Sequence, residues 1–134
     1  MGFTGPLGDR IAIQDLNASY SDAVTRHDVS AFMSLWAEDA VWVHPDLGEI
    51  TGVSAIWKTI EAAFRSYPMV ILRSTIGWLT VDGEAATGSV YIDEVVTTTE
   101  GATNRVYGLY DDVYVKQFEH WRFKRRVYRP FYRD

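Results

Sequence analysis

The sequence contains no cysteine among its 134 residues. This absence excludes disulfide bonds, a thiolate nucleophile and cysteine-ligated zinc or iron–sulfur centres, and it fits a reducing compartment. No apolar run approaches the roughly 20 residues that a membrane-spanning helix needs. Residues 1–10 also lack the basic start and the apolar stretch of a secretory signal. We therefore expect a cytoplasmic protein with no membrane partner.

Metal-binding and cofactor-binding motifs are missing as well. The three histidines, His27, His44 and His120, show neither the HxH nor the HxxxH spacing of a metal site. The chain has no glycine-rich phosphate loop, nucleophile elbow or dinucleotide fingerprint. The sequence therefore predicts no metal and no cofactor.

Positive charge is scarce except near the end of the chain. The net charge is -5, yet residues 116–134 hold seven of the thirteen lysines and arginines. These cations alternate with aromatic residues as in an amphipathic strand, and the domain as a whole is acidic. We expect no nucleic-acid partner, and we expect the cations to pair with acids elsewhere in the molecule or in a second copy.

The apolar spacing predicts an α+β domain over residues 9–134, preceded by a flexible segment, residues 1–8, with three glycines and a proline. Asp9 can cap a first helix that runs to His27, with Tyr20 and His27 on one face. A short second helix starts at Asp28 or Ser30, and a third covers about 53–67. A short strand is predicted at 40–44, followed by a loop at 46–52. From residue 69 onward, alternation and turn signals predict a long antiparallel meander with strands at 69–81, 85–98, 105–117 and 121–132.

Strand alternation places two charges on predominantly apolar faces. Glu94 lies in phase with Ile92 and Val96, and Arg125 lies in phase with Phe123. A buried charge needs a partner or a ligand. If both faces are the concave one, the two residues either pair with each other, or Glu94 is a carboxylate with a raised pKa that takes part in catalysis. A bulge in either strand would instead turn its charge outward.

Tryptophan and tyrosine side chains are well suited to line a site for a flat hydrophobic ligand. They predict an apolar pocket that suits a small hydrophobic molecule. Its expected lining is Tyr20, Trp36, Trp42, Trp57, Trp78, Tyr91 and Tyr107. Tyr110, Tyr114 and Tyr128 are expected on the outer face of the sheet, where they would support a homodimer or a higher homo-oligomer.

Several local patterns together resemble a known family. They are Tyr20 on the first helix, Asp28 at the start of the second, Leu-Trp-Ala-Glu-Asp-Ala-Val-Trp at 35–42, Gly52 before the third helix, and Trp-Arg-Phe at 121–123. This combination resembles the SnoaL-like branch of the nuclear transport factor 2 (NTF2) superfamily. The resemblance implies a cone-like α+β fold, in which a curved, mainly antiparallel sheet and three helices surround an apolar pocket.

The resemblance also implies two alternative sets of catalytic residues. By similarity to ketosteroid isomerases, His44 before Pro45 would be the general base, and Tyr20 and Asp112 would stabilise the oxyanion. This implies a cofactor-free isomerase, lyase or cyclase acting on small hydrophobic carbonyl or hydroxyl compounds, polycyclic ones among them.

By similarity to the dehydratases and dehydrochlorinases, Asp28 would orient a histidine on the first long strand. That position falls at Arg73 or Ser74, so the histidine base is missing. Asp28 then either forms a salt bridge with Arg73 or serves only as a helix cap. His27, next to Asp28, is either a substitute base or a residue at the edge of the core. The expected substrate-binding residues are His27, Trp42, Arg73, Trp78, Glu94, Tyr107 and Arg125. A non-catalytic binding domain and a dimer-forming structural subunit remain alternatives.

Overall fold

The computed structural model describes residues 2–134, which form three helices and seven strands. The helices are α1 (Leu7–Arg26), α2 (Val29–Met33) and α3 (Val53–Ser66). The strands are β1 (Phe3–Thr4), β2 (Trp36–His44), β3 (Gly48–Thr51), β4 (Met69–Asp82), β5 (Ala85–Thr97), β6 (Thr103–Gln117) and β7 (His120–Arg133). None of the three helices is both long and hydrophobic enough to span a membrane.

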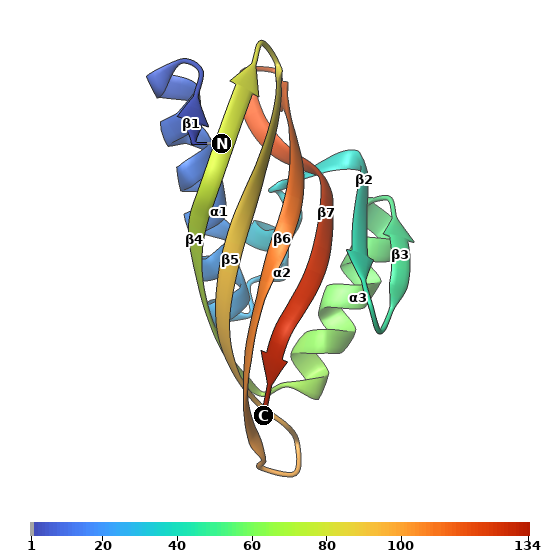
Figure 1. Cartoon of the computed structure of the whole chain (residues 1–134). Helices are drawn as coiled ribbons and strands as arrows, with labels where there is room; N and C mark the ends of the chain where they lie inside the picture. The colour runs from blue at the N-terminus through green and yellow to red at the C-terminus, as the bar shows by residue number, and fades with distance from the viewer. Residues whose placement is uncertain (1) are drawn as a thin grey trace.

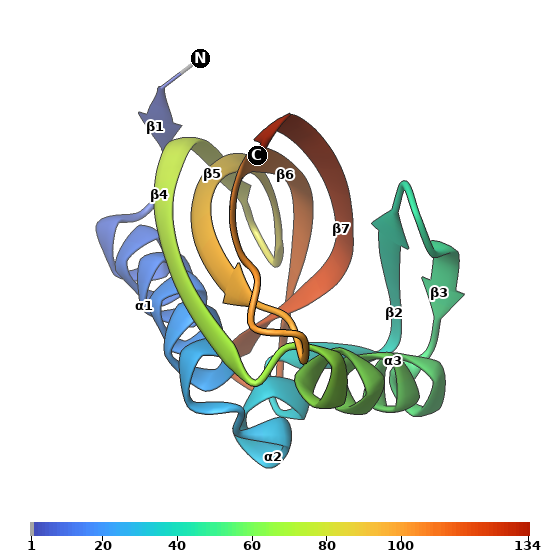
Figure 2. The same ribbon diagram turned by 90° about the horizontal axis from the view of Figure 1, so that it is seen from below.

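All seven strands belong to one strongly curved sheet with the order β1-β4-β5-β6-β7-β2-β3. The meander from β4 to β7 is antiparallel, whereas β1 pairs with β4 and β2 with β7 in parallel. Figures 1 and 2 show the three helices on one side of this sheet, which stays open and does not close into a barrel. The predicted α+β architecture is confirmed, with β1 and β3 as additional edge strands.

The hydrophobic core lies between the helices and the inner face of the sheet. On α1, the predicted three- and four-residue spacing buries Ile13, Leu16 and Tyr20. Phe32 from α2 and Phe123 from β7 are completely buried against them. His27 does not continue the helical face, because it ends α1 in a left-handed conformation with φ 57°.

The caps of the first two helices differ from each other. The α1 helix begins at Leu7 after Pro6 and has no side-chain cap. Asp9, predicted to cap this helix, instead accepts hydrogen bonds from Trp121 Nε1 at 3.0 Å and Lys116 Nζ at 3.3 Å. It therefore ties the start of α1 to the sheet. Asp28 does act as a cap, since its Oδ1 accepts from the Ala31 backbone N–H at 3.0 Å.

A bulge in β7 decides which of its cations faces the core. Phe123 pairs with Tyr114 and Arg125 pairs with Val113, so Lys124 is an extra residue between two consecutive pairs. One extra residue reverses the inward and outward alternation of the residues after it, here as far as Pro130. Arg125, predicted to face inward, is therefore exposed, and Arg126 is only 1% exposed.

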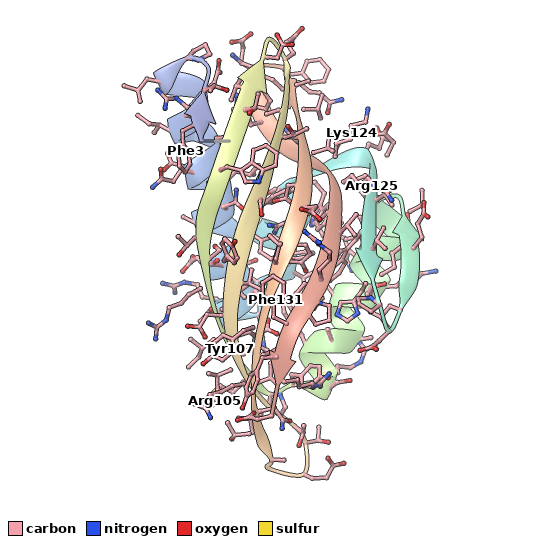
Figure 3. All side chains as sticks on the ribbon, viewed as in Figure 1. Phe3, Arg105, Tyr107, Lys124, Arg125 and Phe131 are labelled. Carbon is pink, nitrogen blue, oxygen red and sulfur yellow. The ribbon has the colours of Figure 1, made fainter. Side chains whose placement is uncertain are left out.

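Several aromatic residues of β5, β6 and β7 lie on the opposite face of the sheet from the one predicted. Tyr110, Tyr114 and Tyr128, expected on the outer face, are buried on the inner face. Tyr91 and Tyr107 lie outside instead, because the neighbouring Ile92 and Val106 face the core. Figure 3 shows Tyr107 and Phe131 on the face of the sheet opposite to α1 and α2. Four residues predicted to line the pocket are therefore exposed or face outward: Trp57, Trp78, Tyr91 and Tyr107.

Candidate functional site

The most deeply buried polar residues form a closed hydrogen-bond network. Arg126 donates from Nε to Asp112 Oδ1 at 2.7 Å and from Nη2 to Asp112 Oδ2 at 2.9 Å. Arg126 Nη2 also donates to Asn17 Oδ1 at 3.2 Å. The Tyr114 hydroxyl donates to Asp112 Oδ2 at 2.7 Å and accepts from Asn17 Nδ2 at 3.0 Å. The network links α1 to β6 and β7.

Aromatic rings enclose the Arg126 guanidinium. Its central carbon lies 4.5 Å from the Tyr20 ring centre, 4.0 Å from that of Tyr110 and 4.2 Å from that of Phe123. Such contacts between a cation and aromatic faces are favourable in a desolvated site. This end of the interior is filled by the protein's own side chains, and Tyr20 is 3% exposed within it.

Asp112 does not have the arrangement expected of an oxyanion donor. Burial raises the pKa of the Asp112 carboxyl, and the Arg126 charge opposes this shift. Both carboxyl oxygens accept hydrogen bonds from the guanidinium, an arrangement that requires an ionised carboxylate. Asp112 therefore accepts hydrogen bonds in a buried ion pair and has no proton to donate.

A line of stacked rings leads from this network toward His44. The Tyr110 and Tyr128 ring centres are 5.2 Å apart, and the His44 ring stacks on Tyr128 at 5.1 Å with an interplanar angle of 19°. Trp42, which lies inside as predicted, donates from Nε1 to the Tyr110 hydroxyl at 3.2 Å. Tyr110 and Tyr128 thus stand between Tyr20 and His44, and the two residues do not form one site.

His44 is arranged as a hydrogen-bond donor rather than as a base. Its Nδ1 accepts from the Asp46 backbone N–H at 3.2 Å, which places the proton of the neutral ring on Nε2. Burial lowers the pKa of His44, so the neutral form is favoured. The ring is partly exposed, and its Nε2–H is the group available to a ligand.

Glu94 lies on the inner face, as its strand phase predicts. Its cross-strand neighbours are Leu72 and Val106, and no side chain within residues 2–134 forms an ion pair with it. Burial in this apolar environment raises the pKa of Glu94 from 4.5 to about 7. The carboxyl therefore changes charge near neutral pH, which suits a group that transfers protons.

The Tyr128 hydroxyl lies over Gly108, whose partner on β5 is Ile92, two residues before Glu94 on the same face. A Cβ added at Gly108 would lie 2.7 Å from this hydroxyl oxygen, so only glycine allows the ring to lie against β6 here. The hydroxyl is buried and has no hydrogen-bond partner in the described chain. Burial raises the pKa of Tyr128, and the charges of Tyr110 and Glu94 raise it further. We refer to Glu94, Tyr128 and His44 as the acid–base cluster.

The predicted pair of Asp28 and Arg73 does not form. Asp28 caps α2, whereas Arg73 is exposed on the outer face of β4 opposite Asp93. Ser74 takes the inward position on β4, and its hydroxyl lies 2.6 Å from that of Ser21. His27 stacks on Phe64 at 4.4 Å between their ring centres, and its buried Nε2 has no partner.

Sequence reasoning missed Arg126, Tyr128, Asn17 and Gly108. The only signal for Arg126 was the run Lys124-Arg125-Arg126, in which any one of the three residues could face inward.

Within residues 2–134, no group of three or more histidine, aspartate or glutamate side chains is placed to hold a metal ion.

Two surface grooves accompany these interior features. One of about 590 Å³ lies between the end of α3 and the turn after β5, and one of about 460 Å³ lies between α1 and α2. Neither groove is lined by a member of the acid–base cluster.

The open curved sheet and the three covering helices give the chain an NTF2-like α+β fold. Residues 6–127 match the family model described as the SnoaL-like domain. The chain belongs to the SnoaL-like family, which confirms the resemblance found in its sequence. No curated protein matches the sequence.

Solved structures share this fold. A candidate scytalone dehydratase from Novosphingobium aromaticivorans is 23% identical with a TM-score of 0.86, over 96% of this chain and 87% of the other. The LinA-type3 hexachlorocyclohexane dehydrochlorinase from Novosphingobium barchaimii is 20% identical with a TM-score of 0.86, over 96% and 90%. A protein of unknown function from Mycobacterium tuberculosis is 24% identical with a TM-score of 0.85, over 94% and 78%. At these identities the similarity establishes the fold alone.

Proposed function

We propose that this protein is a cofactor-free acid–base enzyme, a lyase, isomerase or cyclase, that acts on small hydrophobic carbonyl or hydroxyl compounds. One observation carries the proposal: the Glu94 carboxyl, with its pKa raised to about 7, shares the inner face with the unpartnered Tyr128 hydroxyl, and its charge raises the pKa of that hydroxyl. Perturbed carboxyl groups beside unsatisfied donors are characteristic of catalytic sites. The dehydratase and dehydrochlorinase names among the structural neighbours agree with this reaction class.

The cluster supports a simple sequence of proton transfers. Ionised Glu94 removes a proton from the carbon next to a carbonyl group, and the electron pair of that C–H bond moves toward the carbonyl oxygen. The Tyr128 hydroxyl and the His44 Nε2–H donate hydrogen bonds to the resulting oxyanion. Protonated Glu94 then returns the proton to another carbon, which is isomerisation, or protonates a departing hydroxyl group, which is elimination of water.

The originally predicted catalytic residues have other roles in this proposal. His44 is a hydrogen-bond donor, as its occupied Nδ1 requires. Tyr20 and Asp112 are positioning residues, because they hold Arg126 and Tyr110 behind the Tyr128 ring. Asp28 stabilises the start of α2.

The proposal is tested by incubating the purified protein in D₂O with a panel of cyclic ketones and hydroxyketones. Exchange of protons next to the carbonyl group, and loss of water, are followed by NMR. We expect catalysed exchange whose rate increases with pH through about 7, because Glu94 must be ionised to act as the base. Saturable ligand binding without exchange or elimination at any pH would instead support a non-catalytic binding domain.

A second copy of the chain is proposed to cover the outer face of the sheet. Aromatic rings form two pairs there: the exposed Tyr91 and Phe131 at 6.3 Å between ring centres, and the half-buried Tyr107 with the exposed Tyr132 at 5.7 Å. The same face carries charges of both signs, such as the ion pair of Arg129 with Asp111, so it is complementary to itself across a two-fold axis.

Analytical ultracentrifugation tests this homodimer. We expect Phe131→Glu to convert a dimer into a monomer, because it places a charge within the apolar contact. The control is Phe118→Glu, in the turn between β6 and β7, where the side chain is 92% exposed. A wild-type monomer, or equal effects of both substitutions, would contradict the proposal.

A further inference from the structure

Arg133 lies on the inner face of the sheet, in line with Glu94. It pairs with Val106 on β6, and Val106 pairs with Glu94 on β5. Directly paired residues of neighbouring strands project to the same face. A second bulge in β7, where Phe131 is the extra residue between two pairs, is what directs Arg133 inward.

The neighbouring residue holds this end of β7 in place. Asp134 accepts from the Arg105 backbone N–H and, at 3.1 Å, from Arg105 Nε. Asn104 Nδ2 donates to the Asp134 backbone carbonyl oxygen at 2.8 Å. These bonds join the end of β7 to β6, so the register that places Arg133 in line with Glu94 is fixed.

Arg133 differs from the other arginines nearby in having no acidic partner. Arg126 pairs with Asp112, and Arg129 pairs with Asp111 at 2.8 Å. Within residues 2–134, no carboxylate lies within ion-pair distance of Arg133. Its positive charge nevertheless acts on all members of the acid–base cluster. It adds to the lowering of the His44 pKa, and it opposes the effect of burial that raises the pKa values of Glu94 and Tyr128. A free cation thus stands at the accessible side of an otherwise apolar and acidic site.

We propose that the ligand of this site carries a carboxylate, which pairs with Arg133 while its hydrophobic body lies against Tyr128 and Val106. The inference rests on the proposed function and names the substrate class, a hydrophobic carboxylic acid. The planar guanidinium matches a carboxylate in two-point geometry.

Binding of a carboxylate also fits the proposed chemistry. Once its charge is neutralised by the ligand, Arg133 no longer stabilises ionised Glu94, so Glu94 holds a proton more strongly when substrate is bound. A stronger base is thereby produced only in the complex that needs it.

Matched ligand pairs test this inference. Binding of aromatic carboxylic acids, such as naphthoic acids, is compared with that of their primary amides by tryptophan fluorescence titration at low and high salt. We expect the wild-type protein to prefer the acid by about 10- to 100-fold, a typical contribution of a charge-assisted hydrogen bond. The preference should decrease at high salt, because Arg133 is exposed.

Three substitutions test whether Arg133 causes the preference for the acid over the amide. Arg133→Gln should abolish the preference for the acid, and Arg133→Lys should retain part of it, because the charge remains while the planar fork is lost. Lys124→Gln removes a charge of the same sign from an exposed position on β7, and it should leave the preference intact. Thermal unfolding of each variant confirms that it is folded.

Equal affinity for acids and amides, no binding of any acid, or an unchanged preference in Arg133→Gln would each overturn the inference. The proposed function fails separately. A protein that prefers acids through Arg133 but exchanges no protons supports the carboxylate site and contradicts the enzyme. A protein that exchanges protons of neutral ketones, with no effect of Arg133→Gln, supports the enzyme and overturns the carboxylate site.

Discussion

Replacing Asp112 with alanine should lower the free energy of unfolding by about 3–5 kcal/mol, because it leaves the Arg126 charge buried without its partner. The side chains of Arg126 and Asp112 are 1% and 0% exposed, so water cannot compensate for the loss. Two of the three hydrogen bonds that Arg126 donates, and the one from the Tyr114 hydroxyl, disappear together. Urea unfolding followed by tryptophan fluorescence measures the change.

Asp111 provides a matched control for this experiment. It is the adjacent residue and also pairs with an arginine, Arg129 at 2.8 Å, but its side chain is 48% exposed. Asp111→Ala should therefore cost less than about 1 kcal/mol, as surface ion pairs do. Replacing Asp112 with leucine and Arg126 with methionine in the same chain should recover part of the stability, since no charge is then left unpaired. Similar losses in Asp112→Ala and Asp111→Ala would show that the buried network contributes little.

Replacing Glu94 with glutamine should change how stability depends on pH. The folded-state pKa of about 7 is above the ordinary 4.5, so between these pH values the unfolded chain releases a proton that the folded protein retains. The free energy of unfolding of the wild-type protein should therefore decrease as the pH rises through this window. Above it, Glu94→Gln should be more stable than the wild type by about 3 kcal/mol, whereas below pH 4.5 the two should be similar.

Denaturant unfolding at a series of pH values measures this difference. The control is Glu84→Gln, at the exposed turn between β4 and β5, which removes the same charge without changing a buried group. A constant difference between wild type and Glu94→Gln across the pH range would show that the carboxyl has an ordinary pKa.

The same Glu94→Gln variant should lose most of the proposed activity. A glutamine amide cannot accept the proton, so proton exchange should decrease by about 100- to 10,000-fold, the usual contribution of a general base. The NMR exchange assay in D₂O measures the rate under identical conditions. Retained exchange in this variant would assign the base to another residue. Increased stability together with lost activity would show that Glu94 is kept for chemistry at a cost to folding.

Local sequence signals predicted much of the fold. The three- and four-residue spacing of Ile13, Leu16 and Tyr20 indicated the buried face of α1, and that prediction is confirmed. A turn predicted at Asp82-Gly83 does join two long strands, but the turn residues are Gly83, with φ 64°, and Glu84, because Asp82 still pairs with Ala85 at the end of β4. The short edge strands β1 and β3 were missed, because their pairing with β4 and β2 leaves little pattern in so few residues.

The candidate site was predictable only in part. Glu94 was placed on the inner face because alternation along β5 is regular from Val90 to Val96. Arg125 and Tyr128 were placed on the wrong faces, because the extra residue Lys124 reverses the alternation of β7. Nothing in the sequence marks that bulge, which depends on how β7 pairs with β6.

The sequence by itself determined the fold class, the family and the position of Glu94 on an apolar face. These properties depend on periodicity and on local motifs, which neighbouring residues along the chain specify. Only the tertiary structure decided that Asp112 pairs with Arg126 and that Tyr128 lies over Gly108 on the same face as Glu94. Those contacts join strands and helices that are far apart in sequence, so they exist only once the sheet has formed. A single extra residue in β7 also changes which side chains take part in them.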